Sequence, residues 1–82
     1  MPAVTDPIAE HLAALAARGA SPATLRAYRS DLSDYAAWLA ERGSAATDAT
    51  RADVRAYAAH LAANGLAPAT RARRLSAVRG WR

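Results

Sequence analysis

The stretch SPATLRAYRSDLSDYAAWLAE, residues 21–41, carries the longest helical pattern of the sequence. Apolar and aromatic side chains recur in it at intervals of three or four residues, at Leu25, Tyr28, Leu32, Tyr35, Ala36 and Leu39. Ser21 and Pro22 form a typical helix start, because a serine hydroxyl caps the first amides and proline has no amide hydrogen to leave unpaired. Gly43 is a typical helix end. We therefore predict a long helix between Ser21 and Gly43 that buries this stripe.

Three further helices are expected on the same grounds. Their starts are Thr5 or Asp6 with Pro7 for the first, a capping box of Thr50 and Asp53 for the third, and Pro68 for the fourth. Their apolar stripes are Ile8, Leu12 and Leu15 in the first, Val54, Tyr57 and Leu61 in the third, and Leu75 and Val78 in the fourth. Gly19 ends the first helix and Asn64-Gly65 the third. Since no window alternates with the period of a strand, the sequence predicts an all-α bundle of four helices, a single domain over residues 1–82.

Composition narrows the class of protein. The chain has 82 residues and no cysteine, which excludes disulfides and thiolate zinc sites. No apolar run approaches the roughly 20 residues that cross a bilayer. The N-terminal segment carries acids where a secretory signal carries basic residues. We therefore expect a cytoplasmic protein that is not inserted in a membrane.

Positive charge gathers at the C-terminal end of the chain. Residues 1–64 hold six arginines and seven acids, whereas residues 65–82 hold five arginines and no acid. A one-sided basic segment of this kind indicates a polyanionic partner. A basic tail without any partner is the alternative.

Two helix starts share the pattern Gly-x-x-Pro-Ala-Thr, in GASPAT at residues 19–24 and GLAPAT at residues 65–70. The structural interpretation is that a glycine ends one helix and a proline begins the next. The functional interpretation is that both helix starts offer amides and a threonine hydroxyl to phosphates. The repeat alone does not decide between them.

The helix faces opposite the apolar stripes separate into two kinds. At 100° per residue, the outer face of the second helix carries Arg26, Ala27, Ser30, Asp34, Ala37 and Glu41. The outer face of the fourth helix carries Ala69, Thr70, Arg73, Ala77 and Gly80, with Arg74 and Arg79 beside it. Small residues beside a projecting arginine let a helix approach a DNA major groove. An ordinary solvated face would carry mixed charges, and the fourth helix carries no acid. Arg71 falls at an inward position and does not fit this pattern.

The segments SPATLRAYRSDL and ATRARRLSAVR resemble motifs of one known family. The first is similar to the Ser-x-x-Thr-x-x-x-Tyr-x-x-Asp-Leu stretch, and the second to the Arg-x-Leu-Ser-Ala-Val/Leu-Arg segment, of the N-terminal core-binding domain of tyrosine recombinases, the Xer, Cre and phage-integrase family. DVRAYAAHLAANGLA, between them, is similar to a third family segment. The resemblance extends over about residues 8–79.

This resemblance implies a SAM-like bundle that clamps one side of a double-stranded recombination half-site through its second and fourth helices. It places the DNA contacts at Thr24, Arg26, Ser30, Ala69, Thr70, Arg73 and Arg74. It implies a tetrameric assembly of the longer enzyme on DNA, and a further helix and a separate catalytic domain beyond Arg82, so that this chain is expected to be a fragment. The sequence departs from the family pattern at Ala67, Arg71, Gly80 and Arg82, which leaves the packing of both ends of the fourth helix open.

Catalysis by this chain is not expected. The family's chemistry needs a nucleophilic tyrosine with arginine, lysine and histidine groups, and lysine is absent. Tyr28, Tyr35 and Tyr57 all fall on inward stripes, where core packing is the better interpretation. His11 and His60 lie on different helices without a partner at ligand spacing, so we expect no metal and no cofactor.

An interaction module is the alternative from another class. The end of the fourth helix is expected to leave Val78 and Trp81 exposed, which favours self-association or a contact between recombinase subunits. Trp38, off the core stripe, is open to the same interpretation or to being half-buried. A stand-alone helix-turn-helix regulator is less favoured, because no short turn joins two short helices.

Overall fold

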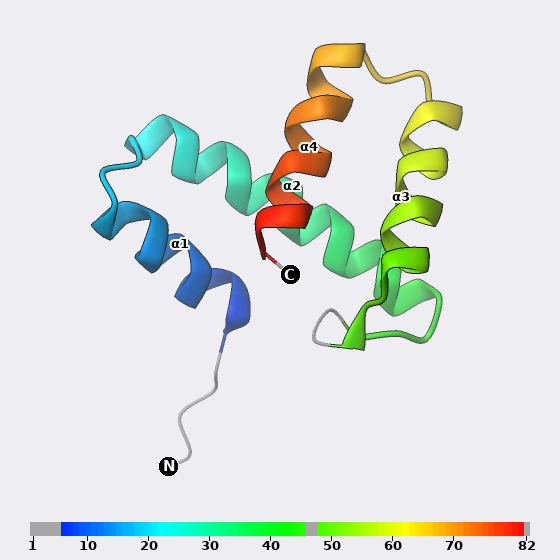
Figure 1. The fold of residues 1–82 in the computed structure, drawn as a ribbon, viewed down its shortest axis with the longest axis horizontal. Helices are drawn as coiled ribbons and strands as arrows, with labels where there is room; N and C mark the ends of the chain where they lie inside the picture. Colours follow the sequence, from blue (N-terminus) through cyan, green and yellow to red (C-terminus); the bar gives the residue numbers. More distant parts are fainter. Residues whose placement is uncertain (1–5, 46–47, 82) are drawn as a thin grey trace.

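The computed structural model describes residues 6–45 and 48–81 and contains four helices there. They are α1 (Pro7–Ala17), α2 (Pro22–Glu41), α3 (Arg51–Ala63) and α4 (Pro68–Trp81), shown in Figure 1. The described residues form no strand. The prediction of an all-α bundle of four helices is confirmed.

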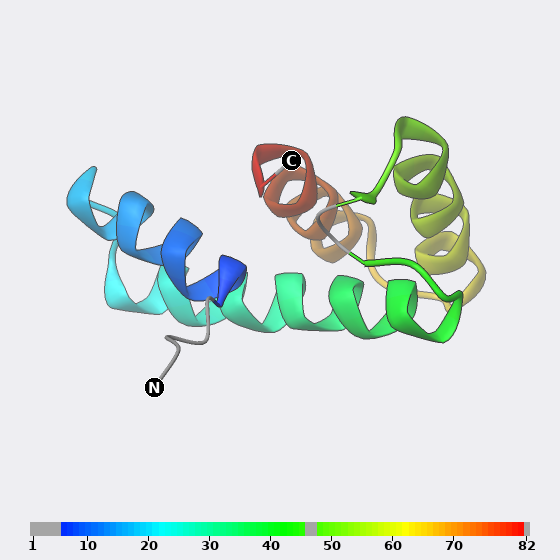
Figure 2. The same ribbon diagram turned by 90° about the horizontal axis from the view of Figure 1, so that it is seen from below.

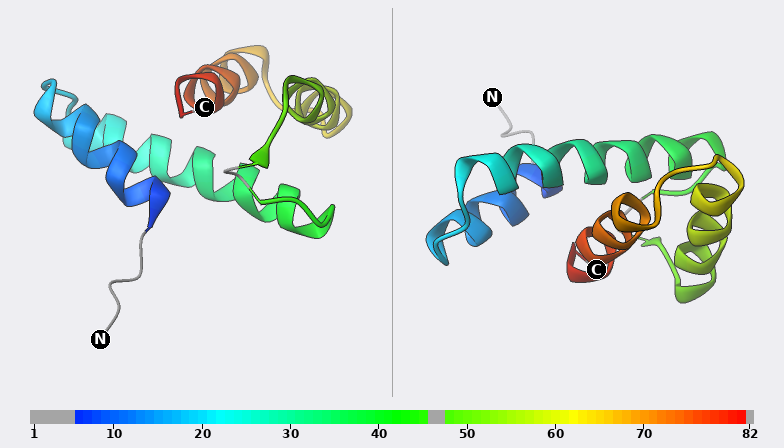
Figure 3. Two further views of the ribbon diagram at one scale, coloured as in Figure 1. Left: turned by 60° about the horizontal axis from the view of Figure 1, so that its bottom comes forward. Right: turned by 90° about the horizontal axis from the view of Figure 1, so that it is seen from above.

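The longest helix, α2, is the platform on which the others pack. Figure 2 shows α2 along one side of the molecule, with α1, α4 and α3 on its other side. α1 folds back along the first half of α2, and α4 crosses the middle of α2. α3 runs antiparallel beside α4, near the C-terminal end of α2, so α1 and α3 lie toward opposite ends of α2 with α4 between them (Figure 3). α2 therefore touches every other helix.

Side-chain caps begin the first three helices. The Asp6 carboxylate accepts hydrogen bonds from the amides of Ile8 and Ala9 at 3.1 and 3.2 Å. The Ser21 hydroxyl accepts from the Thr24 amide at 3.1 Å. Thr50 and Asp53 bond each other's amides reciprocally in a capping box. These predicted starts are confirmed, with Asp6 as the first cap; Thr5 lies outside the described residues.

The glycines of the two Gly-x-x-Pro-Ala-Thr repeats end helices. Gly19 and Gly65 have φ of 94° and 70°, in the left-handed region where other residues are strained. Each lies two residues after the last residue of a helix, and the proline of each repeat opens the next helix. The structural interpretation of the repeat is confirmed.

The core joins α2, α3 and α4. Its buried members are Leu32, Tyr35 and Leu39 from α2, Val54, Tyr57 and Leu61 from α3, and Ala77 and Val78 from α4. The stripes predicted for α2 and α3 supply all six of their members. On α4, Val78 is buried as predicted, while Leu75 is half-buried and packs against the core.

The predicted rotation of α4 is partly wrong. Ala77 was expected to face outward, yet it is only 4% exposed. The interaction-module alternative expected Val78 to be exposed at the end of the helix, whereas it is fully buried. The inward face is turned toward Arg74, Ala77 and Trp81, because two long-range contacts fix the helix: an ion pair to α2, described below, and a hydrogen bond to α1.

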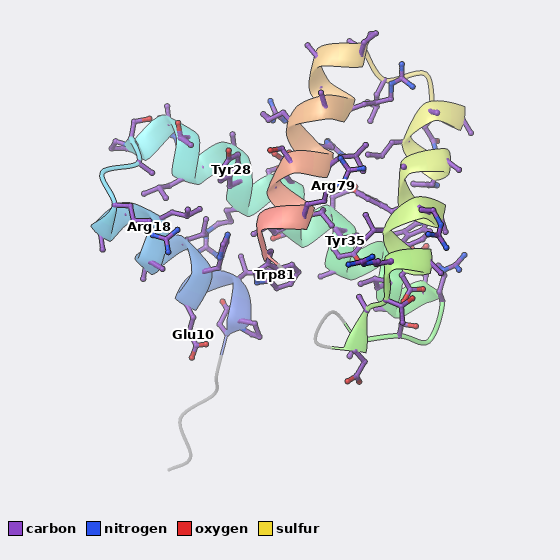
Figure 4. The ribbon with its side chains drawn as sticks, in the orientation of Figure 1. Glu10, Arg18, Tyr28, Tyr35, Arg79 and Trp81 are labelled. Carbon is purple, nitrogen blue, oxygen red and sulfur yellow. The ribbon has the colours of Figure 1, made fainter. Side chains whose placement is uncertain are left out.

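The hydrogen bond to α1 comes from Trp81. Its indole Nε1 donates to the Pro7 carbonyl oxygen at 3.3 Å, and Figure 4 shows the ring beneath the end of α4. The ring is half-buried and meets Tyr35 edge-on, with centroids 6.4 Å apart.

Trp38 is also half-buried and packs against the core, with the Arg42 guanidinium 4.5 Å from its ring centroid. Both tryptophans therefore contribute to packing within the chain.

Leu32 lies fully buried at the centre of α2. Leu32→Ala is expected to lower the free energy of unfolding by about 2–5 kcal/mol, because it opens a cavity that three helices line. Urea denaturation followed by circular dichroism measures this loss. Leu15→Ala, at a half-buried position on α1, is the matched control and should cost clearly less. Equal losses would contradict this account of the core.

Tyr57 joins α3 to α2 through its side chain. The ring is fully buried, and its hydroxyl donates to Asp34 Oδ2 at 2.6 Å. Burial, followed by the hydrogen bond to the Asp34 carboxylate, raises the pKa of the Tyr57 hydroxyl well above its ordinary value. The neutral hydroxyl is thus the form that the folded state holds.

A raised pKa makes folding stability fall at alkaline pH. Below a pH of about 10 both states keep the proton, whereas above it the unfolded state releases the proton and the folded state does not. The free energy of unfolding should therefore fall by about 1.4 kcal/mol per pH unit in this range, relative to Tyr57→Phe. Denaturant titrations of both proteins between pH 8 and pH 12 measure the difference. A constant difference across this range would contradict the assignment.

Candidate nucleic-acid interface

Where α4 crosses α2, Arg73 forms an ion pair with the fully buried Asp31. Arg73 Nε donates to Asp31 Oδ2 at 3.0 Å, and Nη2 donates to Asp31 Oδ1 at 2.9 Å. Asp31 is 0% exposed, while the Arg73 side chain is 46% exposed. The two parallel bonds match the fork of a guanidinium to a carboxylate. Arg73 is therefore bound on its inner edge and open on its outer edge.

Arg74 makes a second ion pair beside the first. Its Nη1 donates to Asp34 Oδ2 at 2.9 Å, and its Nε lies 3.6 Å from Asp31 Oδ1. Its side chain is 21% exposed, less than half as much as that of Arg73. The Asp34 oxygen that accepts from Arg74 also accepts from Tyr57.

We call these five residues, Asp31, Asp34, Tyr57, Arg73 and Arg74, the ion-pair network. It connects α2, α3 and α4 through side chains. Its two carboxylates balance its two guanidinium groups, so the network as a whole is close to neutral. The hydrogen bonds that Arg73 donates to Asp31, and then the charge of Asp31, raise the pKa of the Arg73 guanidinium above its ordinary value, and Arg73 stays charged.

The residues predicted to contact DNA occupy the first halves of α2 and α4. Arg26, Ser30 and Ala69 are exposed, and Thr24 and Thr70 are half-buried. Thr24 Oγ1 accepts a hydrogen bond from the Ser21 hydroxyl at 2.9 Å. Both helices begin on the upper side of the molecule in Figure 1, and α4 crosses α2 with its first half on that side. The structure thus brings the beginnings of both helices to one side of the molecule, while Arg74 pairs with Asp34 of α2.

Sequence reasoning missed two features of this region. Arg29 is exposed like Arg26, and both line a groove of about 310 Å³ between α1 and α2, whose other walls are apolar: Ala9, Leu12, Ala13, Ala16 and Leu25. The spacing of Arg26 and Arg29 on one helix was the available signal. The pairing of Asp31 with two arginines of α4 had no local signal, because 42 residues separate Asp31 and Arg73.

The first turn of α4 differs from the other helix starts. Ala67, which precedes it, has no side chain able to cap the amides, and the turn contains no acid. Arg71 is half-buried, in keeping with its inward wheel position, and its Nε is buried without a hydrogen bond in the described part of the chain. The start of α4 therefore keeps unpaired donors and an unpaired positive charge.

The other residues singled out in the sequence form no recognisable centre. His11 is half-buried, and His60 is exposed and lies 3.3 Å from the Asn64 side-chain amide. Across residues 6–45 and 48–81, no three His, Asp or Glu side chains gather closely enough to hold a metal ion. None of the helices in these ranges has the length and apolar character needed to span a bilayer.

Comparison with known proteins agrees with this architecture. A family model described as the phage integrase N-terminal SAM-like domain matches residues 8–81. The tyrosine recombinase XerD of Rhizobium meliloti (strain 1021) is 42% identical over 64 residues, which cover 78% of this chain and 21% of that protein. This chain therefore spans about a fifth of the relative's length. No solved structure matches it.

The matches coincide with the part of the chain that folds into four helices, and they concern an N-terminal domain and not a catalytic one. The resemblance seen in the three sequence motifs is confirmed. This chain belongs to the phage integrase N-terminal SAM-like domain family.

Proposed function

We propose that this domain binds double-stranded DNA and clamps one side of a recombination half-site through the first halves of α2 and α4. The observation that carries the proposal is the state of Arg73, in the first half of α4, whose guanidinium is held by Asp31 while its side chain remains 46% exposed. A fixed, outward-facing guanidinium suits a phosphate or a guanine edge.

Long-range attraction comes mainly from arginines outside the ion-pair network. Arg26, Arg29 and Arg71 form no ion pair with any described residue, whereas Asp31 and Asp34 offset the charges of Arg73 and Arg74. The first turns of α2 and α4 contain no acid. Helix starts without acids favour phosphates, because their free amides and their dipoles both attract anions.

Short-range contacts come from small and hydroxyl-bearing side chains. Ser30, Thr24 and Thr70 supply hydroxyl groups for phosphate oxygens. Ala69 is exposed at the start of α4 and adds no bulk, so the helix backbone approaches the duplex closely. Arg74 acts mainly as an anchor of α4, because most of its side chain is covered.

Strand exchange is proposed for the longer protein and assigned to a region outside this chain. The family model that matches concerns the N-terminal domain, and this chain covers 21% of the curated relative. Tetramer assembly on DNA is likewise proposed for the longer protein. The cytoplasm is the proposed location because DNA is the proposed partner.

Trp81 is half-exposed at the end of α4, so self-association through this residue stays a prediction.

Binding to a short random duplex is expected to be weak and steeply dependent on salt. Arg26→Ala should weaken binding at low salt and reduce the slope of log K against log salt by about 0.9, the contribution of one neutralised phosphate. Fluorescence-anisotropy titrations at several salt concentrations measure both quantities.

Arg51→Ala is the control for this measurement. Arg51 is exposed and carries the same charge, but it lies at the start of α3, at the opposite end of the α3–α4 pair from the start of α4. Its removal should leave the slope nearly unchanged. An equal effect of both variants, or no binding by the unaltered domain at low salt, would contradict the proposed interface.

A further inference from the structure

Stability alone does not explain why the Asp31 carboxylate is buried. Transferring a carboxylate from water to a protein interior costs several kcal/mol, and its ion pairs only recover that cost when the geometry is good. Apolar residues of similar size in place of a buried ion pair are often equally stabilising or better. Asp31 is the one charged residue that is buried in the described part of the chain, and it lies under the helix proposed to meet DNA.

The geometry shows what Asp31 does to Arg73. A guanidinium carries five N–H donors, and Asp31 takes one at Nε and one at Nη2. Three donors remain, two on Nη1 and one on Nη2, and none of them points at the buried carboxylate. A free arginine side chain loses about 2 kcal/mol of rotamer entropy when it is fixed, and here that loss occurs on folding, before any ligand arrives.

We propose that Asp31 is a positioning residue for DNA binding, which holds Arg73 in one orientation with its three remaining donors presented to a phosphate or a guanine edge. The inference rests on the proposed function, that the first halves of α2 and α4 face DNA. It adds the residue that sets the strength of the central contact, although this residue is fully buried and cannot touch DNA itself.

Arg74 stabilises the buried charge of Asp31 when Arg73 binds a ligand. Its Nε lies 3.6 Å from the Asp31 oxygen that also accepts from Arg73 Nη2. When Arg73 also bonds a phosphate, its interaction with Asp31 weakens. Asp31 then keeps Arg74 as a second positive partner and is not left as an uncompensated buried charge. Asp34 and Tyr57 hold Arg74 in place through their own hydrogen bonds.

Positioning and simple charge predict opposite signs for one substitution. Asp31→Asn removes a negative charge from the neighbourhood of the proposed interface, which by charge alone tightens binding to DNA. If Asp31 positions Arg73, the same substitution weakens binding, because an amide offers one acceptor oxygen instead of two and Arg73 loses its fixed orientation. Glu41→Gln is the control, since it removes one negative charge from an exposed position of the same helix while the ion-pair network keeps all its contacts.

The experiment measures affinity of the 82-residue chain for a short random duplex at low salt, by fluorescence anisotropy. Asp31→Asn and Arg73→Ala are each expected to weaken binding about tenfold. The double variant should bind no more weakly than Arg73→Ala alone, because the two residues act as one unit. Glu41→Gln should bind as well as the unaltered chain or better. Unchanged or tighter binding by Asp31→Asn, or a double variant whose loss is the product of the two single losses, would overturn the proposal.

A second variant guards against loss of the fold. Far-UV circular dichroism checks that Asp31→Asn keeps its helix content at the temperature of the assay. If it does not, Arg73→Lys replaces it, because lysine keeps the charge and the ion pair but lacks the planar fork. Arg73→Lys should weaken binding about tenfold, whereas Arg26→Lys should stay within about threefold of the unaltered chain. Equal effects at the two positions would overturn the positioning role.

Failure of the inference and failure of the proposed function are distinguishable. If the unaltered chain does not bind DNA at low salt, the proposed function is wrong and the inference is overturned with it. If the unaltered chain binds with a steep salt dependence and Asp31→Asn binds equally well, only the positioning role is wrong.

Discussion

The ion pair between Asp31 and Arg73 fixes how α4 crosses α2, and the arrangement of the remaining helices follows from that crossing. The pair is two-pronged, with bonds of 2.9 and 3.0 Å, and its acid is fully buried, so a slide or turn of α4 would break bonds that cannot be replaced by water. Arg74 and Tyr57 extend the same network to α3. Trp81 fixes the far end of α4 to α1 through the Pro7 carbonyl.

The same crossing determines which side of the domain is suited to a polyanion. The starts of α2 and α4 lie on the same side of the molecule (Figure 1), without acids in their first turns, and Arg26 and the outer edge of Arg73 are exposed. The crossing also cancels part of the charge of the basic segment, because Asp31 and Asp34 pair with two of its arginines. The proposed interface therefore combines a few free arginines, suited to attracting a duplex from a distance, with one fixed arginine, suited to a short-range contact.

Local interactions made the helix ends predictable from the sequence. The rotation of α4 was not predictable in full, because long-range interactions determine it. The caps at Asp6, Ser21 and Thr50 bond amides within three residues, so their patterns are visible in short segments. The rotation of α4 depends instead on partners 42 and 74 residues away, at Asp31 and Pro7. This is why the outward position of Ala77 was predicted wrongly, and why the involvement of Arg74 with α2 was not foreseen.

The claim that DNA meets the first halves of α2 and α4 is tested most directly by amide chemical-shift mapping during titration with a duplex. The account predicts shift changes concentrated in residues 22–30 and 68–74, with those of α3 little affected. Shift changes concentrated on α3, or on the side of α1 that carries Glu10, would contradict it.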